Sequence, residues 1–201
     1  MVVTPESQFC VEGFPRSANT YAVAAMLVSQ SISIEVIARH THLVGQVRRA
    51  IQMSVPTMIL IRNPAEAAVS LKLFAPYLSL RQCLRAYERF YSGLLQYKDD
   101  LVIAKFEQVT DDYNEVLKQM NHKFGLDLKS FDKATMEVEV FDLVEQLDKR
   151  IHRNNLTNEF TVARPSERRR DLKKGMLEEL GHNEYQSILD RCQNIYEAYI
   201  S

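Results

Sequence analysis

Polar residues gather directly after the first apolar run of the chain, in the segment GFPRSANT (13–20). The run ends at Gly13, a turn with Arg16 follows, and a pattern of small and apolar residues typical of a helix begins at Ser17. Backbone N–H groups at a helix start, together with the helix dipole, attract anions. Arg16 adds a positive charge, and short polar side chains follow it at Ser17, Asn19 and Thr20. The segment predicts an anion site; the alternative is a helix capped by Ser17 or Asn19, with Arg16 in solvent.

The same layout returns in the segment MILIRNPAEAAVS (58–70). Arg62 ends an apolar run, a helix pattern follows it, and Ser70 lies about two helical turns further along the chain. An arginine fork and a serine hydroxyl in this arrangement can hold a phosphate. The alternative is that Arg62 pairs with Glu66 while Ser70 faces a neighbouring element.

Four apolar segments alternate with helix patterns before residue 127. The expected strands are residues 8–13, 32–39, 57–61 and 101–106, and the expected helices are residues 17–30, 43–53, 63–74, 79–97 and 111–126. This alternation predicts an α/β fold with a parallel sheet that is flanked by helices and joined by right-handed crossovers. Both polar segments follow strands, so we expect them at the carboxyl edge of the sheet, where parallel sheets bind ligands.

The last third of the chain carries helix patterns without a strand signal. Residues 141–152 and 171–200 are expected to be helical, with the polar and basic interval 152–170 between them. At 201 residues the chain suits one domain. We therefore expect a single domain over 1–201, with a core at about 8–126 and a helical appendage at about 127–201.

Composition narrows the classes of function. A net charge of −1 gives no electrostatic case for binding nucleic acid or an acidic membrane. Cys10, Cys83 and Cys192 are far apart and are expected to be free thiols, and no metal-ligand cluster is visible. Neither a signal-peptide pattern nor an apolar run of spanning length is present, so a cytoplasmic protein is expected. The oligomeric state stays open.

Taken together, the two polar segments resemble the signatures of the sulfotransferase family. GFPRSANTY (13–21) resembles the family's Pro-Lys/Arg-Ser-Gly-Thr-Thr loop, which binds the 5′-phosphosulfate of 3′-phosphoadenylyl sulfate. RNPAEAAVS (62–70) resembles its Arg-Asn/Asp-Pro-x-Asp/Glu-x-x-x-Ser motif, which binds the 3′-phosphate. The resemblance covers roughly residues 9–126 and is nearest to compact bacterial sulfotransferase-like proteins. It implies a P-loop-like three-layer sandwich of a parallel sheet and helices, with a helical C-terminal part.

The resemblance also implies roles for individual residues. HTHL (40–43) matches a Lys-Thr-His-Leu segment of cytosolic members, so His42 is the implied general base and Arg16 the implied catalytic cation. Tyr21 matches an aromatic residue that stacks on adenine. The residues implied to bind the donor are Arg16, Ser17, Ala18, Asn19, Thr20, Tyr21, Arg62 and Ser70. A further cation for the nucleotide is expected from Arg168, Arg169 or Arg170, and Ala18-Asn19 stand where the family usually has Gly-Thr.

The implied reaction is in-line transfer of a sulfuryl group to a hydroxyl or amine of a small-molecule or glycan acceptor. The protein would act by positioning and by stabilising charge, without a metal. An imidazole such as that of His42 suits the removal of the acceptor's proton at neutral pH. Two alternatives stay open. One is a P-loop-like nucleotide kinase or triphosphatase, although the Gly-Lys-Ser/Thr ending is missing. The other is a member of the same fold that binds nucleotide without catalysis.

Overall fold

Four parallel strands form one sheet in the order β2-β1-β3-β4. The computed structural model describes the backbone of residues 1–151 and 167–201 and the side chains of residues 1–149 and 171–201. The strands are β1 (Phe9–Gly13), β2 (Ile37–Arg39), β3 (Thr57–Ile61) and β4 (Val102–Lys105). β1 pairs with β2 and β3, and β3 pairs with β4, all in parallel. The predicted α/β fold with a parallel sheet is confirmed.

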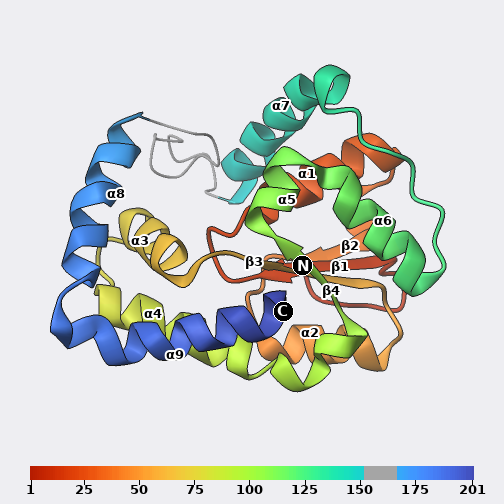
Figure 1. Ribbon diagram of the computed structural model, residues 1–201. Coiled ribbons are helices and arrows are strands. Elements are labelled where there is room, and N and C mark those ends of the chain that lie inside the picture. Colours follow the sequence, from red (N-terminus) through yellow and green to blue (C-terminus); the bar gives the residue numbers. More distant parts are fainter. Residues whose placement is uncertain (152–166) are drawn as a thin grey trace.

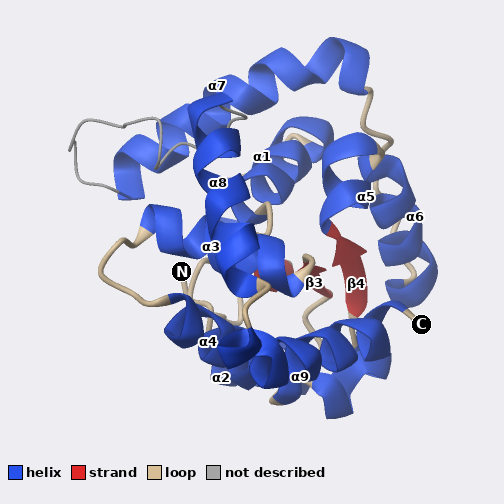
Figure 2. Cartoon of the chain, turned by 60° about the vertical axis from the view of Figure 1, so that its left-hand side comes forward, coloured by secondary structure: helices blue, strands red, loops and turns tan. Residues whose placement is uncertain are grey.

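Helices cover both faces of this sheet. They are α1 (Asn19–Gln30), α2 (Val44–Gln52), α3 (Pro64–Phe74), α4 (Leu80–Ser92), α5 (Phe106–Asp111), α6 (Tyr113–Phe124), α7 (Lys133–Ile151), α8 (Glu167–Leu180) and α9 (Asn183–Ile200). Figure 1 shows α1, α5, α6 and α7 on one face and α2, α4 and α9 on the other. α3 and α8 lie beyond the carboxyl edge, in the foreground of Figure 2. Each face has its own apolar core, which gives three layers.

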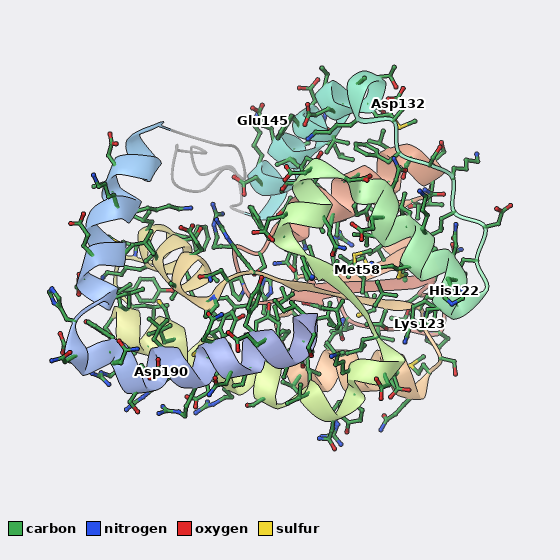
Figure 3. All side chains as sticks on the ribbon, viewed as in Figure 1. Met58, His122, Lys123, Asp132, Glu145 and Asp190 are labelled. Carbon is green, nitrogen blue, oxygen red and sulfur yellow. The ribbon has the colours of Figure 1, made fainter. Side chains whose placement is uncertain are left out.

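The centre of the sheet is apolar on both faces. Every residue of β3 is buried, and Figure 3 shows Met58 between the helix layers. A strand covered on both faces needs an uninterrupted apolar run, because neither side of it meets water. This explains why the segment TMILI was identified correctly from the sequence.

Several predicted elements have other bounds in the structure. The strand expected at 32–39 is a 3₁₀ turn (Ile34–Val36) followed by the short β2, because the Ser33 side chain accepts a hydrogen bond from the Glu35 N–H. The helix expected at 79–97 ends at Ser92, and a 3₁₀ helix (Leu95–Asp100) follows. The helix expected at 171–200 is two helices, α8 and α9, separated by a turn at Gly181.

The strand expected at 101–106 ends one residue earlier, at Lys105, where α5 begins. α5 itself was not predicted. The helix expected at 141–152 begins eight residues sooner, at Lys133, and runs along α1. The C-terminal helices thus complete both faces of the sheet, since α7 packs on α1 and α9 packs on α4.

Two buried tyrosines of α4 tie the ends of β1 and β3 together. The Tyr91 hydroxyl donates to the Leu60 carbonyl (2.7 Å) and accepts from the Phe14 N–H (3.2 Å). The Tyr87 hydroxyl donates to the Arg62 carbonyl (2.8 Å). These bonds engage backbone groups at the carboxyl ends of β1 and β3, and so they fix the two segments that follow these strands.

We predict that Tyr91→Phe lowers the free energy of unfolding by about 1–3 kcal/mol, because it leaves buried backbone groups without their hydroxyl partner. Chemical denaturation measures the loss. The matched control is Tyr77→Phe, since Tyr77 is 85% exposed, and we expect it to change stability by less than about 0.5 kcal/mol. Equal effects of the two substitutions would contradict the proposed tie.

Candidate functional site

The loop between β1 and α1 has the backbone form of an anion cradle. Arg16 and Ala18 both have left-handed backbone angles, with φ of 69° and 68°. Left-handed residues that alternate with right-handed or extended ones turn successive N–H groups toward one point, which is how backbone nests bind anions. Ala18 is the N-cap of α1 and supplies no side-chain cap. The start of α1 is therefore available to an external anion, and the simple capped helix that the sequence left open is not what forms.

Side chains close this loop from inside. The Asn19 amide donates to the Phe14 carbonyl across the loop (2.9 Å). The Ser17 hydroxyl is fully buried beside the Tyr91 hydroxyl and makes no hydrogen bond of ordinary geometry with any described residue. Gly13 is required before the loop, because a Cβ there would lie 2.6 Å from the Leu60 carbonyl oxygen. The loop is thus held against β3, and the Ser17 hydroxyl remains able to donate to a ligand.

Arg62 follows the carboxyl end of β3, and its side chain is only 12% exposed. Its guanidinium donates to the Arg16 carbonyl (3.2 Å) and to Glu66 Oε2 (3.1 Å) and lies 4.0 Å from the centre of the Phe106 ring. Burial lowers the pKa of Arg62, while the carboxylates of Glu66 and Glu107 raise it. An arginine stays charged under such conditions. The Arg62–Glu66 pair that the sequence left open is therefore present.

A second cation joins this pair from α8. Lys173 Nζ lies 3.4 Å from Glu66 Oε2. Both residues line a hollow between α3 and α8, of about 470 Å³, together with Lys174, Leu177 and Glu178. Sequence reasoning missed Lys173; the only signal was its place in the basic run that follows residue 163. Ser70 is buried on α3, two turns from Arg62. Arg62 and Lys173 bring two positive charges to this edge, where the carboxylates of Glu66 and Glu107 also act on Arg62.

His42 lies beside the loop, on the segment that follows β2. Its Nδ1 is 2.7 Å from the Gly13 carbonyl oxygen. A carbonyl only accepts, so Nδ1 carries the proton and, in the neutral ring, Nε2 keeps its lone pair. The backbone of His42 is left-handed, with φ of 53°. This tautomer is the one in which Nε2 can accept a proton.

Glu12 holds this segment, and sequence reasoning missed it. Its carboxylate accepts from the Thr41 N–H (2.8 Å), the Thr41 hydroxyl (2.9 Å) and the His42 N–H (3.0 Å). Its Oε2 lies 3.8 Å from His42 Nδ1, and the side chain is completely buried. The signal in the sequence was an acidic residue within the otherwise apolar strand FCVEG.

His40 connects the same segment to α1. Its Nε2 lies 3.1 Å from the Thr20 hydroxyl, and its backbone is left-handed, with φ of 56°. Burial, with help from nearby His42 and Arg39, lowers the pKa of His40 to about 3. His40 is therefore neutral near neutral pH and fixes the direction of the Thr20 hydroxyl. The segment from His40 to His42 is thus joined to the loop at two points, through Gly13 and through Thr20.

The structure brings most of the expected residues to one edge of the sheet, but not all of them. Tyr21 is buried, and its ring packs edge-on against Phe141 of α7. Its hydroxyl has no hydrogen-bond partner among the residues that the structure describes, and burial raises its pKa to about 12. Stacking on adenine stays a prediction, and it requires α7 to expose the ring. Arg168 and Arg169 belong to α8, but their side chains, like that of Arg170, lie outside the described residues.

Two features are absent from the described part of the chain. No group of three or more His, Cys, Asp or Glu side chains is placed there to hold a metal ion. In the same residues, no helix combines the length and the apolar character that crossing a membrane requires.

Comparison with known proteins supports the fold. No protein-family model matches the sequence, and no curated protein matches it. Among solved structures, a mouse sulfotransferase complexed with PAP matches with a TM-score of 0.52 and 9% sequence identity. The match covers 94% of this chain and 90% of that chain. This distant similarity shows that the chain has the P-loop-like α/β fold of a sulfotransferase, with a helical C-terminal part.

We predict that Ala18→Gly raises the free energy of unfolding by about 0.5–1 kcal/mol, because glycine removes the strain of a left-handed alanine. Ala22→Gly, in the interior of α1, is the control; it should lower stability by about 1 kcal/mol or more, since glycine is unfavourable there. Denaturant titration measures both. A loss of stability in Ala18→Gly would contradict the left-handed cap.

We predict that buried His40 makes the fold sensitive to acid. In the unfolded chain a histidine binds a proton below pH ~6.5, whereas folded His40 does so only near pH 3. Stability is therefore lost as the pH falls through this window, by about 2 kcal/mol between pH 7.5 and 5 from this group alone. His40→Asn, which also tolerates left-handed angles, should remove that part of the loss. Parallel pH profiles of the two proteins would contradict the assignment.

Proposed function

We propose that this protein is a sulfotransferase that moves a sulfuryl group from 3′-phosphoadenylyl sulfate to a hydroxyl or amine acceptor. The observation that carries the proposal is the position of His42. Its Nδ1 proton is held by the carbonyl of Gly13, the residue from which the anion loop starts. A base and an anion cradle joined in this way suit a group transfer. In such a transfer the acceptor loses a proton while negative charge develops on the leaving part of the donor.

The loop fits the 5′ end of the donor. The left-handed Arg16 and Ala18 shape a cradle for anionic oxygens, and Ser17 adds a buried hydroxyl at the same loop. Thr20, fixed by His40, adds a second hydroxyl at the start of α1. Arg16 and these donors would stabilise the charge that develops on the bridging oxygen of the leaving nucleotide.

The edge beside α3 fits the 3′-phosphate. Arg62 and Lys173 both approach the carboxylate of Glu66, so a phosphate bound beside them would replace that carboxylate as the partner of two cations. The Asn63 side chain already caps α3 by accepting from the N–H groups of Ala65 and Glu66. The α3 terminus is thus satisfied, and recognition of the 3′-phosphate falls to the side chains of Arg62, Ser70 and Lys173.

The chemistry of this chain's own groups follows from that arrangement. A bond forms between sulfur and the acceptor's oxygen or nitrogen, and the bond between sulfur and the bridging oxygen breaks. His42 accepts the acceptor's proton at Nε2, and the Gly13 carbonyl keeps the ring in orientation. The acceptor would be a small molecule or a glycan. Leu43, which is 62% exposed next to His42, offers it an apolar contact.

Binding of matched nucleotides tests the donor. Isothermal titration calorimetry should show tight binding of PAP (3′-phosphoadenosine 5′-phosphate) and weak binding of AMP and ATP, because only PAP carries the 3′-phosphate. Arg62→Gln should weaken PAP at least tenfold and leave AMP nearly unchanged. Preference for ATP would favour a kinase or triphosphatase instead. PAP binding without sulfate transfer to any of a panel of hydroxylated metabolites and glycans would favour the non-catalytic alternative.

We predict that His42→Ala lowers turnover by about 10²–10⁴-fold, the usual contribution of a general base, while PAP affinity stays within about threefold. Transfer from a labelled donor and calorimetry measure the two quantities. Unchanged turnover would contradict the base assignment, and loss of PAP binding would give His42 a structural role in the loop.

A further inference from the structure

Glu12 is a charged residue in a place where an apolar one is expected. It lies in β1, completely buried, on the same face of the strand as Cys10. On that face the strand packs in a small apolar cluster that includes Cys10, Ala38 and Ala50. A buried carboxylate is costly unless it is paired and hydrogen-bonded. Packing alone therefore does not explain why a glutamate occupies this position.

All the hydrogen bonds that the described residues donate to this carboxylate come from one short segment. Thr41 donates twice, to Oε1, and His42 donates its backbone N–H to Oε2. His40 and His42, on either side of Thr41, both have left-handed backbones. Such angles persist only where the surroundings enforce them. The carboxylate supplies that enforcement and so determines where the His42 ring lies.

We propose that Glu12 is the positioning residue of the base: it holds the His42 segment and stabilises the protonated ring by its charge. The inference rests on the proposed function of His42. The Nδ1 proton is donated to Gly13, and Glu12 Oε2 is 3.8 Å away, so Glu12 acts through charge and not through a hydrogen bond to the ring. A proton taken up at Nε2 turns the His42 ring into a cation beside the Glu12 carboxylate. The attraction between the two charges lowers the energy of the transition state.

The other charged or titratable groups near the His42 segment do not stabilise a protonated His42 ring. His40 lies in edge-on contact with His42, and burial keeps it neutral. The amino group of Met1 donates to the carbonyl of Arg39 at the end of β2, and the side chain of Arg39 bonds the carbonyls of Ile34 and Ile37. Met1 and Arg39 are cations and disfavour a protonated imidazole nearby. Among the charged groups of the described residues near this segment, Glu12 is the one that favours a protonated imidazole.

Two substitutions with opposite effects test the proposal. Glu12→Gln removes the charge, so the acidic limb of the pH–rate profile should move to lower pH. Turnover above the limb should fall at least tenfold, with KM for the donor within twofold. Thr41→Val removes one hydrogen bond from the carboxylate, which leaves its charge less satisfied, so the limb should move to higher pH. Glu139→Gln, an exposed position on α7, controls for net charge and should move nothing.

A double-mutant cycle separates a role through His42 from a purely structural one. If Glu12 acts through the base, Glu12→Gln combined with His42→Ala is no slower than His42→Ala alone. Additive losses, or unmoved acidic limbs in both Glu12→Gln and Thr41→Val, would overturn the proposal. If Glu12→Gln does not fold, the shift in Thr41→Val decides alone.

An NMR titration of the His42 ring needs no turnover, and it keeps the two proposals distinguishable. Its midpoint should move down in Glu12→Gln and up in Thr41→Val. Those shifts in a protein without sulfate transfer would refute the proposed function and leave the pairing of Glu12 with His42 standing. Transfer activity with unmoved midpoints would refute the role of Glu12 alone.

Discussion

The hydroxyl of Tyr91 is the contact on which the arrangement of the site depends. It joins the Leu60 carbonyl of β3 to the Phe14 N–H, the first backbone donor beyond β1. Gly13 allows the two strands to approach closely at this level, because any Cβ would meet the Leu60 carbonyl oxygen. Tyr87, one turn earlier on α4, holds the carbonyl of Arg62 in the same way. One helix, α4, therefore positions both the loop after β1 and the segment after β3 that begins at Arg62. Buried contacts of the core, rather than surface loops, determine the distance between these two segments.

Charge is divided between two parts of this edge. On the side of β2, the buried carboxylate of Glu12 faces His42, and burial keeps His40 neutral. On the side of β3, Arg62 and Lys173 share the carboxylate of Glu66. The first part favours a group that gains a proton, and the second favours a multiply charged anion. The loop from Gly13 to Thr20 lies between them, bonded to His42 through Gly13 and to Arg62 through Arg16. One loop therefore connects the two kinds of chemistry.

The sequence predicted those features that are encoded by local pattern. The uninterrupted apolar run at β3, the Pro64 start of α3 and the Gly125 end of α6 all appear where the pattern indicates. Features that depend on tertiary contacts were not visible. α4 stops at Gly93, where any Cβ would crowd Val44 of α2, and no local signal in the sequence marks that contact. Likewise Glu12, Lys173 and Tyr91 reach the site from elements distant in sequence, so spacing along the chain could not pair them with His42 or Arg62. Their roles become apparent only when the sheet brings four segments to one edge.

The departure of this loop from the sulfotransferase pattern is compensated within the loop itself. Ala18 adopts the left-handed angles that a glycine would take, at a cost of roughly 1 kcal/mol. Asn19, in place of threonine, donates its amide to the Phe14 carbonyl and so closes the turn from inside. Ala18 and Asn19 act in the same turn: the side chain of Asn19 holds closed the turn in which Ala18 has its strained left-handed backbone. The backbone cradle thus forms with neither family residue present, and the start of α1 remains uncapped by any side chain of the loop.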